Sequence, residues 1–256
     1  MLFRSDDLVV VGGSGNSSQR GVGHFLLEGG SFVNTSSGTL VGWGHGSGAF
    51  EMTGGTFETK GDFQIVEGPG PDSSASVSGG EFTVGGGLLV GRGKDQGGIG
   101  SFSASGDAKV VADSVRVGTE TIGGTFSLSG DASVETKYFV VGTGSAPGSC
   151  TMSGGTLTIT AGTDGTGAFP LGLGGTSSGE FVQSGGDIVF SNGNAWGAVG
   201  HSGSGTSSYT MTGGTFYMDP NGGNATLVVG RNDTTVGTLD VSGTATLTAR
   251  IVQLGE

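Results

Sequence analysis

The chain has 256 residues, of which 59 are Gly and 33% are hydrophobic, and its formal net charge is −12. This acidity argues against nucleic acid as a partner, because a nucleic-acid-binding surface needs a basic footprint. Only 5 Pro and the lack of a three-residue Gly period exclude collagen, and 14 Phe in register with a repeat argue against disorder. One cysteine excludes an internal disulfide framework, and no apolar run approaches the ~20 residues of a membrane span, so we expect no membrane insertion.

A sequence motif of about 25 residues repeats through the whole chain, and a period of this length is typical of stacked repeat proteins. Each copy has a glycine corner, followed roughly a dozen residues later by a Val-Gly corner. The glycine corners are Gly29, Gly54, Gly79, Gly106, Gly130, Gly154, Gly185, Gly213 and Gly243. The Val-Gly corners begin at Val11, Val41, Val90, Val117, Val141, Val199 and Val229, with variant corners expected at Val66, Leu173 and Leu254.

The residues before each glycine corner alternate between apolar and polar. Four positions before the corner, the successive copies have Phe25, Phe50, Ala75, Phe102, Phe126, Cys150, Phe181, Tyr209 and Leu239. Two positions before it, they have Leu27, Met52, Val77, Ala104, Leu128, Met152, Gln183, Met211 and Val241. The residues between these two columns are mostly polar. Such alternation at matched positions predicts a half-buried strand with one face in the core.

A second strand is expected between the glycine corner and the Val-Gly corner. Its first inward residue is Phe32, Phe57, Phe82, Leu157, Ile188 or Phe216. In three copies that residue comes one position later, at Val110, Val134 or Leu247, after an additional Ala. A bend that is longer by one residue restores the inward direction, because a slip of one residue would turn every side chain over.

The shortest copies have only about 24 residues, too few for two hairpins and a core but enough for one turn of a β-solenoid. The sequence therefore predicts an all-β fold: a parallel β-helix of about nine to ten coils of 24–31 residues, with residues 1–256 as a single domain. At ~4.8 Å per coil the rod would be ~45 Å long. Phe25, Phe50, Phe102, Phe126, Cys150, Phe181 and Tyr209 form the expected core ladder.

Residues with catalytic or metal-binding chemistry are scattered in this sequence. Cys150 stands in the aromatic ladder, which predicts a buried and unreactive thiol. His24, His45 and His201 lie in different copies, with no carboxylate at ligand spacing, so no metal site is expected. Polysaccharide lyases and hydrolases with this fold need carboxylates, or carboxylates with Arg or Lys, on adjacent coils. The column before the glycine corner has only Glu51 and Asp240, so the sequence predicts neither an enzyme nor a cofactor.

Three consecutive copies are longer than the others. The additions at 161–170, 190–196 and 217–224 fall on one side of the predicted rod and carry Phe169, Phe190, Trp196 and Tyr217. Clustered insertions on one face of a solenoid often form its binding face, so these aromatics are a candidate glycan- or protein-binding patch. The alternative interpretation is ordinary loop variation, with the aromatic rings packed onto the rod.

Two segments carry a resemblance to a known kind of repeat. Residues 148–157 and 208–216, each followed by a Val-Gly-type turn, resemble bacterial autotransporter-associated β-strand repeats and repeats of large PEP-CTERM-type surface proteins. This resemblance implies export and display on the bacterial cell surface or in the extracellular matrix. The sequence begins and stops in mid-coil, which fits either a piece of a longer protein or subunits that associate head to tail.

These observations favour a structural or adhesive stalk of a bacterial surface protein. Expected partners are further copies of the chain, head to tail or side by side, and possible further partners are glycans or host and matrix proteins. A binding module that uses the insertions at 161–224 is the first alternative. A polysaccharide lyase or hydrolase ranks third and would need Asp164, Asp187 and Asp219 to meet on one face.

Overall fold

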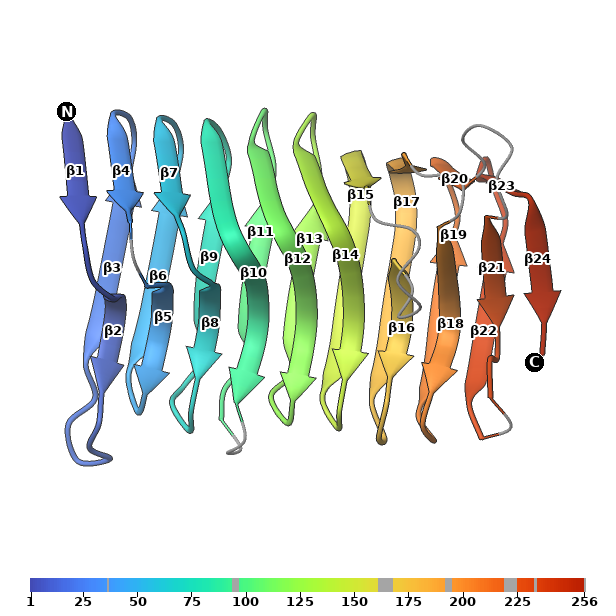
Figure 1. The fold of residues 1–256 in the computed structure, drawn as a ribbon, viewed down its shortest axis with the longest axis horizontal. Helices are drawn as coiled ribbons and strands as arrows, with labels where there is room; N and C mark the ends of the chain where they lie inside the picture. Colours follow the sequence, from blue (N-terminus) through green and yellow to red (C-terminus); the bar gives the residue numbers. More distant parts are fainter. Residues whose placement is uncertain are drawn as a thin grey trace.

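The computed structural model describes residues 1–35, 37–93, 97–160, 168–191, 195–218, 225–232 and 234–255. In these ranges the chain forms 24 strands, and every pairing between named strands is parallel. The coils stack along one axis from the N-terminus to the C-terminus (Figure 1). The predicted parallel β-solenoid is confirmed, with about nine turns. Within the described residues no helix is long and apolar enough to span a membrane.

Each coil contributes to three sheets, which we call I, II and III. Sheet I, before the glycine corner, contains β3 (Val22–Leu27), β6 (Ser47–Met52), β9 (Ser73–Val77), β11 (Gly100–Ala104), β13 (Gly124–Leu128), the first halves of β15 (Pro147–Ile159) and β17 (Ser178–Phe190), β19 (Thr206–Met211) and β22 (Val236–Val241). Sheet II, after it, contains β1 (Leu2–Ser5), β4 (Ser31–Asn34), β7 (Thr56–Thr59), the first halves of β10 (Glu81–Gly93), β12 (Lys109–Glu120) and β14 (Ser133–Thr143), the second halves of β15 and β17, β20 (Thr215–Met218) and β23 (Thr246–Ala249). Sheet III contains β2 (Val9–Ser14), β5 (Thr39–Gly44), β8 (Phe63–Glu67), the second halves of β10, β12 and β14, β16 (Phe169–Leu173), β18 (Trp196–Ser202), β21 (Thr226–Val229) and β24 (Ile251–Leu254).

The segment expected as one strand between the two corners therefore divides between two sheets. In β10 the register with β12 shifts between Val84 and Gly87, where the strand bends from sheet II into sheet III. Glycines at this bend leave the backbone free of side chains on its outer side, which allows a sharp change of direction. The bend gives each coil three sides.

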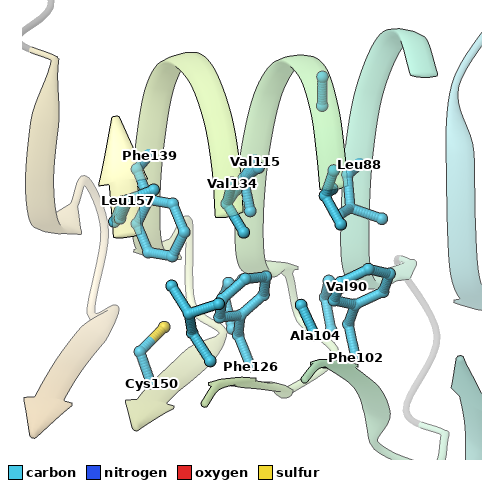
Figure 2. Close-up of a cluster of buried hydrophobic side chains, with 14 of the residues drawn as sticks. Leu88, Val90, Phe102, Ala104, Val115, Phe126, Val134, Phe139, Cys150 and Leu157 are labelled. Carbon is cyan, nitrogen blue, oxygen red and sulfur yellow. The ribbon is translucent and has the colours of Figure 1, made fainter. Parts of the chain in front are cut away.

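The predicted aromatic ladder is confirmed in register. Phe25 pairs with Phe50, Phe102 with Phe126 and Phe181 with Tyr209, and Cys150 lies between Phe126 and Phe181. Phe25 is partly buried, and the other six residues of the ladder are at most 3% exposed. Figure 2 shows Phe102, Phe126 and Cys150 following one another along the core, opposite Val115, Phe139 and other side chains of sheets II and III.

The slip after three of the glycine corners is also confirmed. Phe82 pairs with Val110, and Val134 pairs with Leu157, so the later residues enter the same inward column. The additional residues Ala108 and Ala132 are fully buried. A longer bend thus preserves the inward face without changing the register of the sheet.

Two of the expected variant corners were misplaced. Ile65, not Val66, pairs with Val90, and Leu171, not Leu173, pairs with Val199. The corner residue after the inward Val has a positive φ in the other coils, which normally requires Gly. Val66 occupies that position with φ 59°, so the missing glycine concealed the corner at Ile65 in the sequence. At Leu171 the corner glycine is present as Gly172, and the similar Leu173-Gly174 two residues later was mistaken for the corner.

Serine replaces glycine at the start of two sheet I strands, and each serine side chain makes a specific contact. The hydroxyl of Ser73 accepts a hydrogen bond from the backbone N–H of Gly48 (3.0 Å), and Ser207 accepts one from Gly179 (3.1 Å). Both contacts join adjacent coils in the interior. The serines therefore provide an additional link between coils, and their hydroxyls lie directly against Gly42 and Gly172 at the Val-Gly-type corners of the neighbouring coils.

One polar pair interrupts the apolar core. Tyr209 donates a hydrogen bond to Oε1 of Gln183 (2.5 Å), and Nε2 of Gln183 donates to the carbonyl oxygens of Gly186 (2.9 Å) and Thr215 (3.1 Å). Both side chains are fully buried. The pair is stable in the core because each polar atom has a partner.

We expect Tyr209→Phe to cost about 1–3 kcal/mol, because Oε1 of Gln183 is then buried without its donor. The double substitution Tyr209→Phe with Gln183→Met should recover part of that loss, since Met fills the same column in neighbouring coils. Chemical denaturation of the two single variants and the double variant measures the coupling. Strictly additive losses would contradict a cooperative pair.

Candidate functional site

The outer face of sheet III is hollow over its central coils. A cavity of about 440 Å³ is lined by Asp62, Gly86, Gly87, Leu89, Arg92, Asp113, Ser114, Arg116, Thr119, Glu120 and Thr143. A neighbouring depression of about 390 Å³ is lined by Trp43, Gly44, Glu67, Gly68, Pro69, Arg92, Gly93 and Glu120. Since the two hollows share Arg92 and Glu120, they form one continuous surface, which we call the sheet III groove.

The groove crosses five successive sheet III strands, β5, β8, β10, β12 and β14. Four steps of ~4.8 Å give it a length of about 19 Å along the rod. Leu89 faces outward but is only 7% exposed, and Gly86 and Gly87 leave part of the lining without side chains. The groove is therefore long and shallow, with charged residues around an apolar centre.

Arg92 lies at the centre of the charged residues. Its Nη1 is 3.8 Å from Oδ2 of Asp62 in the preceding coil, and its Nε is 3.8 Å from Oε1 of Glu120 in the following coil. Oδ1 of Asp62 also accepts a hydrogen bond from the backbone N–H of Gly87 (2.8 Å), which fixes that carboxylate. All three side chains are about 40% exposed, so solvent screens the ion pairs and they contribute little to stability.

A row of outward residues leads from this centre to a tryptophan. Trp43 pairs in register with Glu67, Glu67 with Arg92, and Arg92 with Thr119. Trp43 is 42% exposed, so much of its indole ring is open to solvent at one end of the groove. The row combines an aromatic surface, carboxylate acceptors and guanidinium donors on adjacent coils.

Glu120 lines the groove and has a strained backbone conformation. Its φ is 64°, and the only other non-glycine residue with a positive φ in the described chain is Val66, next to the groove residue Glu67. In the next coil the equivalent position is Gly144, with φ 70°. A left-handed conformation is costly for any residue with a Cβ, so the chain places a carboxylate here against the local preference of its backbone.

The aromatic patch expected from the insertions does not form. Phe169 and Phe190 are fully buried in the core, and Phe169 pairs with Gly197 while Phe190 pairs with Ile159. Both therefore belong to inward ladders, and the prediction that they bind a ligand was wrong. Tyr217 is 38% exposed, but it lies on sheet II, whereas Trp196 begins a strand of sheet III.

The indole ring of Trp196 packs against other side chains of the chain and does not offer an open face on which a ligand could stack. Its ring stacks on His201, with centroids 5.1 Å apart, and the guanidinium carbon of Arg231 lies 4.4 Å from the ring centroid. Nη1 of Arg231 is 2.7 Å from Nε2 of His201, and Nδ1 of His201 is 3.0 Å from the hydroxyl of Ser202. These contacts join β18 to the second residue after β21, which favours a structural role for the cluster.

Several sequence hypotheses concern residues that the structure does not describe. Parts of the insertions at 161–170, 190–196 and 217–224, namely residues 161–167, 192–194 and 219–224, lie outside the described residues, and so do Asp164 and Asp219. Asp187 lies on sheet II, paired with Thr156 and Thr215. Among the described residues, no group of three or more His, Cys, Asp or Glu side chains could hold a metal ion. Nε2 of His24 does lie 3.5 Å from Oε2 of Glu51 in the next coil, a contact that the sequence did not predict.

Cys150 is fully buried in the ladder, and burial raises the pKa of its thiol well above the ordinary value. We therefore expect the native protein not to react with a soluble thiol reagent and the unfolded protein to react fully. The folded chain keeps a proton that the unfolded chain loses above pH ~8.5, so this residue should lower stability as the pH rises beyond that value. Labelling during a denaturant titration checks both points, and native labelling would contradict the buried position.

The sequence contains a signal for the groove in the spacing of its charged residues. Asp62, Arg92 and Glu120 are separated by 30 and 28 residues, close to the coil period. Glu51 and Asp240, the carboxylates of the column before the glycine corner, lie on the outer face of sheet I. The columns around the Val-Gly corner become a face of their own only when each coil is known to have three sides.

The comparisons with known proteins give no match for this chain. No protein-family model matches the sequence, and no curated protein or solved structure shows significant similarity. The groove must therefore be interpreted from its own geometry and chemistry.

Proposed function

We propose that this chain is a structural rod of a bacterial cell-surface or extracellular-matrix protein. The observation that carries the proposal is the continuous register of the core: the same inward columns run from the first coils to the last. Stacked rings with centroids 5.0 Å apart, as in Phe25 and Phe50, add contacts between coils. In such a structure each coil stabilises its neighbours, which suits a stiff element of defined length.

The outer surface supports an extracellular setting. The chain is strongly acidic, and the outer face of sheet I carries small hydroxyl side chains over its central coils, such as Ser74, Ser101, Thr125 and Ser149. A surface of this kind favours solubility at high concentration. The resemblance to autotransporter-associated repeats points to the same location.

Association with further coils is part of the proposal. Phe3 is 53% exposed at one end of the rod and Leu254 is 77% exposed at the other. The outermost strands also have unpaired edges, which are templates for another strand. These edges can be covered by a second copy or by adjoining coils of a longer chain.

Negative-stain microscopy across a concentration series, combined with light scattering, tests the rod. We expect straight particles of constant width, and lengthening with concentration would identify second copies as the cover of the ends. Flexible or compact particles would contradict the structural role. Antibody labelling of intact source cells tests the location, and labelling that needs permeabilised cells would contradict surface display.

A further inference from the structure

The geometry points to the sheet III groove as a binding site for an uncharged, polyhydroxylated sugar chain. This inference goes beyond the structural role, because a rod needs no ligand. It rests on the groove's shape, its charge, the available hydrogen-bonding groups and the strained carboxylate of Glu120.

The shape and backbone of the groove favour a sugar chain over a peptide. An extended peptide usually binds a sheet by adding a strand at a free edge. The groove lies on the face of sheet III, and its central strands β8, β10 and β12 have a parallel partner on each side. Their backbone groups are committed to the sheet, so a ligand must be recognised by side chains.

The side chains of the groove match hydroxyl groups. Arg92 lies 3.8 Å from both of its carboxylate partners, which is longer than a hydrogen bond. The ion pairs orient the groups while leaving positions at which N–H groups can donate and carboxylate oxygens can accept. A sugar hydroxyl both donates and accepts, so adjacent hydroxyls can bridge Arg92 and Glu120. Arg116 supplies further donors in the next coil.

The charge of the groove decides between neutral and acidic sugars. The residues that line it include four carboxylates, on Asp62, Glu67, Asp113 and Glu120, and two guanidinium groups, and Lys137 pairs with Asp113 at its edge, so the local formal net charge is −1. The whole chain carries −12. Both values oppose an anionic polymer, which favours an uncharged chain.

Trp43 provides the apolar part of the site. Its indole ring is 42% exposed and stands two coil steps from Arg92 in the same row. The C–H face of a sugar ring can pack on an indole while the hydroxyls at the ring edge reach the charged groups. An aromatic surface beside hydrogen-bonding groups therefore fits successive units of one sugar chain.

Substitution of Glu120 can separate an effect on sugar binding from an effect on stability. A glycine at this position would relieve the positive φ, as Gly144 does in the next coil. Glu120→Gly should therefore raise the melting temperature and at the same time weaken sugar binding. A residue kept only for the fold would not show this opposition.

Isothermal titration calorimetry with neutral β-linked gluco-, xylo- and N-acetylated chitooligosaccharides tests the site. We expect at least one series to bind the unmodified chain, and Trp43→Ala to weaken that binding about tenfold or more. Glu120→Gln, which keeps the backbone strain but removes the charge, should weaken binding while leaving the melting temperature close to that of the parent.

Ser103→Ala, on the outer face of sheet I, is the matched control and should bind like the parent. Circular dichroism and the melting temperature establish that each variant is folded. The inference is overturned if no neutral series binds, if Trp43→Ala and Glu120→Gln bind as well as Ser103→Ala, or if uronate oligosaccharides or peptides bind in preference. None of these results bears on the microscopy test of the rod.

Discussion

Phe126→Ala is expected to lower the free energy of unfolding by about 3–5 kcal/mol. Phe126 is 3% exposed, its ring stacks on Phe102 with centroids 5.5 Å apart, and it meets Phe139 edge-on at 5.2 Å. Figure 2 shows it between the sheets in the middle of the core. The neighbouring coils are held by hydrogen bonds along the rod, so they cannot collapse into the space that the ring leaves.

Thermal and chemical denaturation measure this effect, with Phe3→Ala as the matched control. For a chain of this size the loss corresponds to a fall of about 6–20 °C in the melting temperature. Phe3 carries the same side chain in the first strand of the rod, where it is 53% exposed, so its removal should cost about 1 kcal/mol or less. Equal losses for the two variants would show that the inner ladder does not dominate stability.

The aromatic ladder could be predicted from the sequence because it depends on one local rule. Residues at a fixed distance before a glycine corner point inward, whatever happens elsewhere in the coil. Cys150 could therefore be placed beside Phe126 although the two differ in chemistry, and the register confirms this. A pattern with period two and clear boundaries needs no knowledge of the third dimension.

Positions beyond the bend were harder to predict, for a physical reason. Phe190 follows its glycine corner at the same distance as Ile159 in the coil before, and it is equally buried. The sequence assigned it to an insertion because the expected second strand had no boundary between sheet II and sheet III. Without that bend, the inward column could not be continued past the first residues after the corner.

The sheet III groove could not be predicted for a related reason. Its residues come from five coils, and the row changes from Trp43 through Glu67 and Arg92 to Thr119 and Thr143. Repeat analysis detects what the coils share, whereas a binding site in a repeat protein consists of what they do not share. Glu120 illustrates this point, because it stands where the repeat has glycine.

Gly118→Ala is expected to destabilise the protein by about 2–5 kcal/mol. Gly118 follows Val117 at a Val-Gly corner with φ 72°, where a Cβ costs about 1–2 kcal/mol from the backbone conformation alone. A Cβ built there would also lie 2.2 Å from the carbonyl oxygen of Pro147 in the next coil. That contact is with backbone, which cannot rotate away, so the two coils must separate locally, at a further cost of about 1–3 kcal/mol.

Gly29→Ala separates this effect from the general cost of replacing glycine. Gly29 stands at a glycine corner without a positive φ, and a Cβ there would meet no atom within 4 Å. Its substitution should change stability by no more than about 0.5 kcal/mol. Denaturant titration of both variants, with the same probe of unfolding, gives the comparison. If Gly118→Ala proved as mild as Gly29→Ala, the close approach of the Val-Gly corner to the next coil would not be what sets the spacing of the rod. A large difference would mean that the repeated glycines are required by coil packing, and that the strained glutamate in the groove departs from that requirement.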